Sequence, residues 1–350
     1  MTRSPETVHY PTYIPPYSLH QTGSQTRPET EVNKRDSYRE SIENVSERRL
    51  EMSAVRGLWW MLSFDKRQSL GLFLFCGGAT IAFCLASFQK MSFQMLLKTT
   101  TPVEGYWYEK SPWKASIILH IITGIPSAFF SVFLFLPVTF KLWPRLHGVV
   151  GYVTSFLMVI SCVGGGIVGR RAQGGDLGVQ LGYYMLASGA AASVVVGCVE
   201  GWRGAFDAHR EWMLRVWVYN GAIITMHATA IVSAKVITLI GGYYSFMRCA
   251  EVDYLTSSDS MSQQFPQCST SDPYNTYVVV PASWRGTKLG ESSAVRASFG
   301  MSMLLAVFLH CVGVEVYLRA TREDSVRLRE WSERRRLRTS MRAEQVYPLS

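Results

Sequence analysis

The sequence predicts an all-α fold, namely a polytopic membrane helix bundle with a disordered N-terminal tail and a basic C-terminal helix. Of its 350 residues, 48% are hydrophobic and only 17% are charged, whereas about 25% are charged in a typical soluble protein. The apolar residues also gather in long runs without charges. Each run approaches the roughly 20 residues that cross a bilayer as a helix, and together they predict about six transmembrane helices.

The N-terminal part precedes the first apolar run. Residues 1–45 are rich in Pro, Thr, Ser and Tyr without periodicity, which predicts a disordered cytosolic tail. Residues 46–68 alternate basic residues with Leu, Trp, Met and Phe, a pattern typical of an amphipathic helix in the membrane interface. The run over 69–89 is the first predicted transmembrane helix.

Four further runs within residues 115–240 predict a core four-helix membrane domain, spans 2 to 5. Small residues mark two of these spans, with Gly164 to Gly166 in span 3 and the pattern Gly189-x-x-x-Ser193-x-x-x-Gly197 in span 4. Such ridges let helix backbones approach closely in lipid, so we expect helix packing there. A flat cofactor that uses the same space is the alternative.

The last part of the chain combines a loop, a span and a tail. Residues 241–296 form the predicted extracytosolic loop, which contains the strand-like run YNTYVVVPASW. Cys249 and Cys268 share this loop and are candidates for a disulfide in an oxidising compartment, with free thiols as the alternative. A sixth transmembrane helix is expected over 297–318. Residues 319–350 form a basic cytosolic tail whose charge-alternating composition favours a helix.

The positive charge predicts the orientation of the chain. When the loops are alternated across the membrane, most of the 35 Lys and Arg residues fall on the side of both tails. The positive-inside bias therefore places both termini in the cytosol, in a plasma membrane or an endomembrane. This bias and contact with anionic headgroups account for the net charge of +9. We therefore expect the lipid bilayer, and no nucleic acid, as partner.

Ionisable residues within the predicted spans are mainly histidines. No Asp or Glu lies inside the first five charge-free runs, which argues against a proton-coupled transporter. His120 and His227 would each lie about 9–12 Å from the outer membrane edge, at a helical rise of about 1.5 Å per residue. His147 and His209 would both lie at the inner edge. His310 lies nearer the inner level.

Two histidine pairs at matched depths suggest a cofactor. Imidazoles that face each other between helices are the axial ligands of a b-type haem. The haem iron would be bound by His120 and His227 at the outer level, and by His147 and His209 at the inner level. The alternative is that each histidine only forms a hydrogen bond across a helix interface.

Three arginines lie beside the predicted inner level. Arg145, Arg210 and Arg215 are placed to contact haem propionates if the cofactor is present. Lipid headgroups are the alternative partners of these side chains.

Three short motifs carry a family resemblance. They are LHIITGIP followed by Pro137, WPRLHGVVGYV, and AHREWMLRVWVYN. Together they resemble a bacterial and fungal family of predicted multi-pass membrane proteins with a domain of unknown function, whose His-Arg-x-Trp-Met-x-Arg signature matches His209 to Arg215. The resemblance covers spans 2 to 5 and implies a topology without an activity. More distantly, and by analogy only, the arrangement is similar to transmembrane di-haem cytochrome b proteins, although span 4 contains no histidine here.

Two classes of function follow. One is a haem-b-binding transmembrane electron-transfer protein, which requires a membrane redox partner. The alternative is a cofactor-free membrane protein that acts as a small-molecule facilitator or as an accessory component of a biosynthetic pathway. The sequence contains no phosphate-binding loop, nucleophile elbow or zinc-ligand cluster. It therefore predicts no specific enzymatic activity.

Overall fold

The computed structural model of the chain describes residues 67–256 and 258–346. The predicted disordered tail over 1–45 lies outside these residues, as does almost all of the interfacial segment over 46–68. Within the described part, six helices are long and apolar enough to cross a membrane. The chain is therefore an all-α integral membrane protein.

The six spanning helices follow the predicted order. They are α2 (Arg67–Phe88), α5 (Trp113–Leu134), α7 (Pro144–Gly169), α8 (Leu177–Trp202), α9 (Phe206–Ile240) and α12 (Lys288–Ala320). Two of these helices begin at a side-chain cap. Asp176 accepts hydrogen bonds from the backbone nitrogens of Gly178 and Val179, and Thr287 accepts one from Gly290. Such N-caps satisfy amide groups that a helix leaves unpaired.

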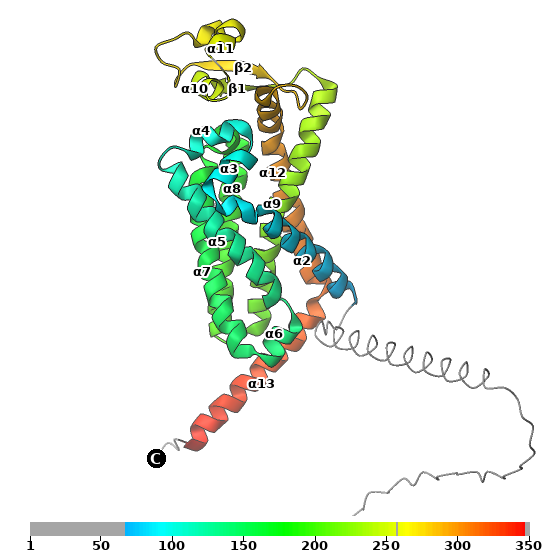
Figure 1. Cartoon of the computed structure of the whole chain (residues 1–350). Coiled ribbons are helices and arrows are strands. Elements are labelled where there is room, and N and C mark those ends of the chain that lie inside the picture. Colours follow the sequence, from blue (N-terminus) through cyan, green and yellow to red (C-terminus); the bar gives the residue numbers. More distant parts are fainter. Residues whose placement is uncertain (1–66, 257, 347–350) are drawn as a thin grey trace, which may run out of the picture. The chain divides into compact units, whose positions relative to one another are not determined.

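Helix packing brings the spans into one bundle (Figure 1). α9 packs against α8 and α12, α5 packs against α7, and α2 contacts α5 and α9. The buried core that fills the bundle consists of Leu96, Tyr106, Trp107, Tyr108, Ile117, Val168, Ala172, Val179, Leu186, Ala222, Met226, Ala230, Phe299, Met303, Ala306 and Val307. Many exposed side chains on the spanning helices are also large and apolar, as expected where helices face lipid tails.

Two of the helices are longer than the apolar runs that predicted them. α9 continues to Ile240, past Lys235, and α12 starts at Lys288, nine residues before the predicted sixth span. Arg296 was predicted to lie at the membrane boundary because a charge-free run follows it. In the structure this residue lies inside α12 and is buried. The loop predicted over 241–296 is therefore shorter than expected.

The segments that follow α2, α7 and α9 gather at one end of the bundle, which we call the hairpin end (Figure 1). There β1 (Tyr244–Arg248) pairs antiparallel with β2 (Tyr277–Pro281), with Phe246 opposite Val279. The other elements of this region are η1 (Gln89–Met91), α3 (Phe93–Thr99), η2 (Pro102–Glu104), α4 (Gly105–Tyr108), η3 (Ala172–Gly175), α10 (Cys249–Asp253), α11 (Ser258–Gln264) and η4 (Pro266–Cys268).

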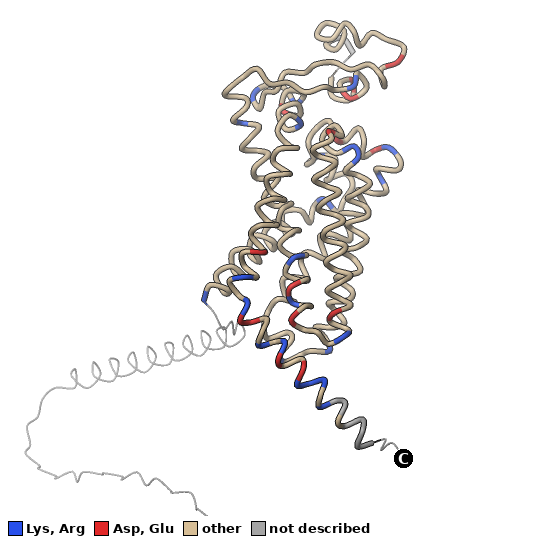
Figure 2. Tube along the Cα trace, turned by 180° about the vertical axis from the view of Figure 1, so that it is seen from behind, with Lys and Arg blue, Asp and Glu red and all other residues tan. Residues whose placement is uncertain are grey.

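The opposite end of the bundle carries α13 (Arg322–Val346), and we call it the tail end. The short helix α6 (Pro137–Leu142) joins α5 to α7 there. α13 contacts the start of α9, and Ser332 accepts a hydrogen bond from the backbone nitrogen of Phe206. Figure 2 shows that charged residues lie mainly toward the two ends, while the middle of the bundle is almost free of them.

Candidate functional site

His120 lies in the contact between α5 and α7. Its Nδ1 donates to the backbone oxygen of Ser161, at 2.8 Å, and the Ser161 hydroxyl donates to the His120 backbone oxygen, at 3.0 Å. The imidazole rests on Gly165, where an added Cβ would come within 2.9 Å of Nδ1. Gly164 lies equally close to the backbone of α5. The small residues of span 3 therefore serve helix packing, one of the two expected uses.

His209 and His310 repeat this arrangement on other helix pairs. His209 on α9 donates from Nδ1 to the backbone oxygen of Gly197 on α8, at 2.7 Å, and its ring rests on Gly201. His310 on α12 donates from Nδ1 to Val218 on α9, at 2.6 Å, and its ring rests on Gly221. An added Cβ would meet either ring at 2.8 Å. We call these three interactions the histidine–glycine contacts.

The two remaining membrane histidines differ from these three. His227 is exposed on the side of α9 and donates from Nδ1 to Ile223 of its own helix, at 2.7 Å. Its ring contacts Phe83 and Phe299. His147 is half-buried at the start of α7, and its Nδ1 has no hydrogen-bond partner among the described residues.

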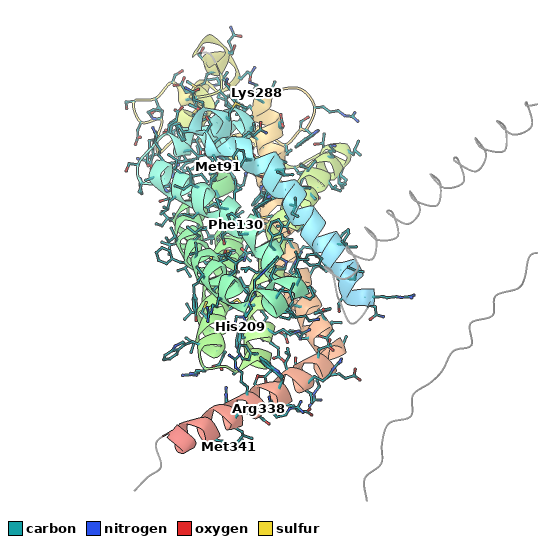
Figure 3. The ribbon with its side chains drawn as sticks, turned by 60° about the horizontal axis from the view of Figure 1, so that its bottom comes forward. Met91, Phe130, His209, Lys288, Arg338 and Met341 are labelled. Atoms are coloured by element: carbon teal, nitrogen blue, oxygen red, sulfur yellow. A yellow bond between two sulfur atoms is a disulfide. The ribbon has the colours of Figure 1, made fainter. Side chains whose placement is uncertain are left out.

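Only one of the two predicted histidine pairs comes together. The His147 and His209 rings lie edge to face with centroids 6.5 Å apart, toward the tail end, where Figure 3 labels His209. His120 contacts α7, whereas His227 contacts α2 and α12. Within residues 67–256 and 258–346 no contact joins His120 to His227. The tail-end pair thus offers two facing imidazoles, and the predicted outer pair does not.

The tail-end pair fits a haem only in part. The backbone oxygen of Gly197 fixes the orientation of His209 and leaves its Nε2 for a ligand, which is the usual arrangement at a metal. However, side chains already cover the glycine surface that a flat macrocycle would need, because His209 lies on Gly201 and Met213 lies on Gly197. In the described part of the chain, no group of three or more His, Cys, Asp or Glu residues could hold a metal ion.

The three arginines predicted beside the inner level have different surroundings. Arg215 is paired with Glu315 through two hydrogen bonds, at 2.7 and 3.2 Å. Arg210 donates to the hydroxyls of Ser325 and Thr321. These two hydrogen bonds join α9 to the start of α13 and to the residue that follows α12. Arg145 is exposed.

Sequence reasoning missed a buried charged cluster at the hairpin end. Arg296 on α12 forms ion pairs with Glu104 of η2, at 3.3 Å, and with Glu251 of α10, at 2.9 Å. The three side chains are at most 4% exposed, and we call them the charged triad. Trp107 donates from its indole nitrogen to Glu251, at 2.5 Å. No signal in the sequence joins these residues, because up to 192 positions separate them.

The two carboxyl groups of the charged triad have opposite pKa shifts. Burial raises the pKa of Glu104 above its ordinary value, against the opposing charge of Arg296 and a hydrogen bond from Gln173. Burial also acts to raise the pKa of Glu251, but the hydrogen bonds and the charge of Arg296 outweigh it and lower that pKa. When two carboxyl groups share one cation, the charge of one carboxylate raises the pKa of the other. The surroundings therefore favour the ionised form of Glu251, whereas Glu104 takes up a proton more readily.

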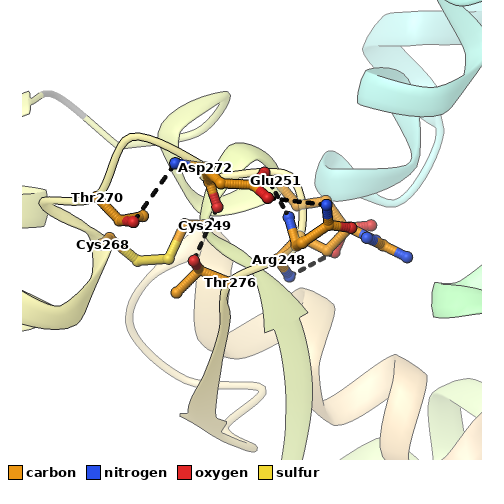
Figure 4. Close-up of a disulfide and its surroundings, with 8 residues drawn as sticks. Arg248, Cys249, Glu251, Cys268, Thr270, Asp272 and Thr276 are labelled. Carbon is orange, nitrogen blue, oxygen red and sulfur yellow. Dashed lines mark hydrogen bonds between the residues drawn. A yellow bond between two sulfur atoms is a disulfide. The ribbon is translucent and has the colours of Figure 1, made fainter.

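A disulfide holds the hairpin end together. Cys249 and Cys268, the pair that the sequence places in one loop, are joined with an S–S distance of 2.04 Å (Figure 4). Both sulfurs belong to a second hydrophobic cluster, which is Val103, Met247, Cys249, Val252, Phe265, Cys268, Val278, Val280 and Leu289. The disulfide thereby connects α10 and η4 over the buried face of the two strands.

Comparisons with known proteins returned no match. No family model matches the chain, and no curated protein or solved structure matches it. The resemblance of spans 2 to 5 to the family with a domain of unknown function stays a prediction.

Proposed function

We propose that the chain is a cofactor-free integral membrane protein that acts as an accessory component of a membrane-bound biosynthetic pathway. The histidine–glycine contacts carry this proposal. They give three of the five membrane histidines a complete packing role, because each Nδ1 is bonded to a neighbouring helix and each ring covers a glycine. Histidines used in this way need no metal.

The filled interior favours an accessory role over a small-molecule facilitator. The bundle core is a continuous cluster that includes Trp107, Met226 and Met303, each almost fully buried. The charged triad lies beside Trp107 at the hairpin end. A facilitator needs a path for its solute, whereas these residues pack against one another along the bundle.

An exposed apolar surface supports contact with a partner protein. Met247, Val278 and Val280 of the hairpin point inward, so the alternate residues of each strand point outward. The outward residues are Tyr244, Phe246, Tyr277 and Val279, which are between 46% and 64% exposed. This face continues along α9 through Ile240, Leu239 and Val236, which are also exposed. Because the surface joins a membrane helix to the hairpin, it suits a partner that is itself embedded in the membrane.

Cross-linking in native membranes tests this proposal. The full chain carrying Phe246→Glu and Val279→Glu is compared with wild type and with Gln264→Glu, which adds charge at another exposed site. We expect cross-links from the hairpin to one integral membrane enzyme in wild type and Gln264→Glu, and their loss in the double variant. Cross-links that are identical in all three chains would contradict the proposal.

A second candidate rests on the facing rings of His147 and His209. If haem b bound there, these two residues would be its axial ligands, and the cofactor would supply one-electron transfer. The test is an absorption spectrum of the detergent-purified chain with and without dithionite. Our proposal predicts no Soret band. A Soret band that disappears in both His147→Ala and His209→Ala would overturn it in favour of the haem protein.

A further inference from the structure

Two arginines at the hairpin end lie against the same buried indole. The guanidinium carbon of Arg171 lies 4.4 Å from the ring centroid of Trp107, and that of Arg248 lies 5.9 Å from it. Both arginines also reach Tyr274, since Arg171 donates to its hydroxyl, at 3.4 Å, and Arg248 donates to its backbone oxygen. Two positive charges from distant parts of the sequence are thus held around one pair of aromatic rings.

Neither of these charges has an acidic partner. Across residues 67–256 and 258–346, no ion pair involves Arg171 or Arg248. The Nε of Arg171 is buried without a hydrogen-bond partner. Cation–π contacts hold such groups in place but leave their charge intact. The two half-buried guanidinium groups therefore present positive charge and N–H donors that suit an anion.

The charged triad fixes both arginines before any ligand arrives. Its two carboxylates accept backbone hydrogen bonds of 2.9 Å, Glu251 from Arg248 itself and Glu104 from Gln173, which follows Arg171 closely. Gln173 has a φ of +49°, and Gly174 continues in the left-handed region at +83°. Non-glycine residues rarely adopt this conformation, and such strain is common where a segment is held for a purpose.

We propose that Arg171 and Arg248 form a binding site for a phosphate group. Guanidinium groups match phosphate oxygens with paired N–H donors, and the exposed rings of Tyr274 and Tyr277 border the site. The phosphate belongs either to a lipid headgroup or to a soluble phosphate compound. The site borders the exposed face of the hairpin at Tyr277, but its two arginines are not changed in the Phe246→Glu and Val279→Glu test of the accessory role, so the two proposals can fail separately.

Binding of two probes to the full chain in detergent tests the site. Inorganic phosphate is titrated by calorimetry, and dioleoyl phosphatidic acid is titrated in mixed micelles. We expect saturable binding of at least one probe. Arg171→Gln should weaken it about 10- to 100-fold, the usual effect of losing a hydrogen bond to a charged group. Arg285→Gln removes an exposed charge from the same end and should leave binding unchanged.

The two probes separate the sources of the phosphate. Arginine-dependent binding of phosphatidic acid alone identifies a lipid, and arginine-dependent binding of inorganic phosphate identifies a soluble compound. Arg248→Gln provides a second variant, and an intact disulfide with an unchanged unfolding temperature shows that each variant is folded. If neither probe binds, or if Arg171→Gln and Arg285→Gln bind equally well, the proposal is wrong.

Discussion

The membrane-spanning part and the hairpin end bury polar groups in different ways. Within the spans, the histidine–glycine contacts join helices through imidazole Nδ1 donors and backbone oxygens of the neighbouring helix. At the hairpin end, the charged triad buries one guanidinium and two carboxyl groups. Loss of a histidine therefore removes a bond and some packing, whereas loss of one member of the triad leaves a buried charge without its partner.

This difference explains how the two regions are positioned. The histidine–glycine contacts set the separation of neighbouring helices, since a ring fits only where the side chain is missing. The charged triad joins η2, α10 and α12, and Glu104 also holds the turn η3 through Gln173. It therefore connects four segments that are separate in the sequence.

The largest effect is expected for Arg296→Met. The variant leaves Glu104 and Glu251 facing each other without a cation, which should lower the stability by about 3–5 kcal/mol. Thermal unfolding in detergent measures the loss, and Arg285→Met serves as the exposed control. If both variants unfold at the same temperature, the charged triad does not hold the hairpin end.

Glu251→Gln should have the next largest effect at neutral pH, about 1.5–3 kcal/mol, because it removes hydrogen bonds to a charged partner. Glu104→Gln should matter less, because Glu104 accepts a proton more readily. Their unfolding temperatures, measured side by side, should rank in this order. The reverse order would contradict the opposite pKa shifts of Glu104 and Glu251.

The same two residues predict the dependence of stability on pH. The pKa of Glu251 is below its ordinary value of 4.5, so its contribution is present above pH 4.5 and is lost as the pH falls through the lowered value. The pKa of Glu104 is raised above 4.5, so its contribution is complete below 4.5 and is lost as the pH rises. Unfolding temperatures measured across pH test both signs. In Glu251→Gln, the loss of stability as the pH falls should disappear. In Glu104→Gln, the loss of stability as the pH rises should disappear.

A smaller effect is expected for Gly201→Ala. The new methyl group would lie 2.8 Å from the Nδ1 of His209, and such overpacking costs about 1–3 kcal/mol, partly offset by the better helix propensity of alanine. Gly166→Ala is the matched control, because nothing lies within 4 Å of its added Cβ. We expect a lower unfolding temperature for Gly201→Ala only. If both variants unfold at the same temperature, the packing of the His209 ring does not require a glycine at position 201.

The smallest effect is expected for Glu315→Gln at the tail end. Its ion pair with Arg215 is short, at 2.7 Å, but the Glu315 side chain is 45% exposed. Exposed pairs contribute only about 0–1 kcal/mol. The unfolding temperature should change little, and a loss as large as that of Arg296→Met would remove the contrast between the two ends.

The sequence predicted the spanning helices because membrane helices need long apolar runs. It placed α2 within a few residues of its observed bounds, and the four core helices together cover 113–240, close to the predicted domain of 115–240. It was less accurate at α12, where Lys288, Glu291 and Arg296 resemble a membrane boundary. Burial of Arg296 against two acidic residues overrides that pattern, and a single sequence does not reveal which acids they are.

The candidate site was predicted less well for a related reason. Depth along a helix placed His147 and His209 at one level, and their rings do face each other. The same reasoning paired His120 with His227, but depth contains no information on helix rotation. His120 faces α7 while His227 lies on the outside of α9. The direction in which each histidine points depends on tertiary packing, which the spacing of residues does not reveal.

The central claim is that His120, His209 and His310 join neighbouring helices through their Nδ1 atoms, a packing role that needs no metal. Asparagine can replace the Nδ1 donor of histidine but cannot replace a haem ligand. The decisive measurement therefore compares two triple variants, in which His120, His209 and His310 are all changed to asparagine or all changed to alanine. The account predicts that the asparagine chain keeps most of the wild-type unfolding temperature, whereas the alanine chain loses several degrees. Equal loss of stability in both chains, together with loss of a visible absorption band, would contradict it.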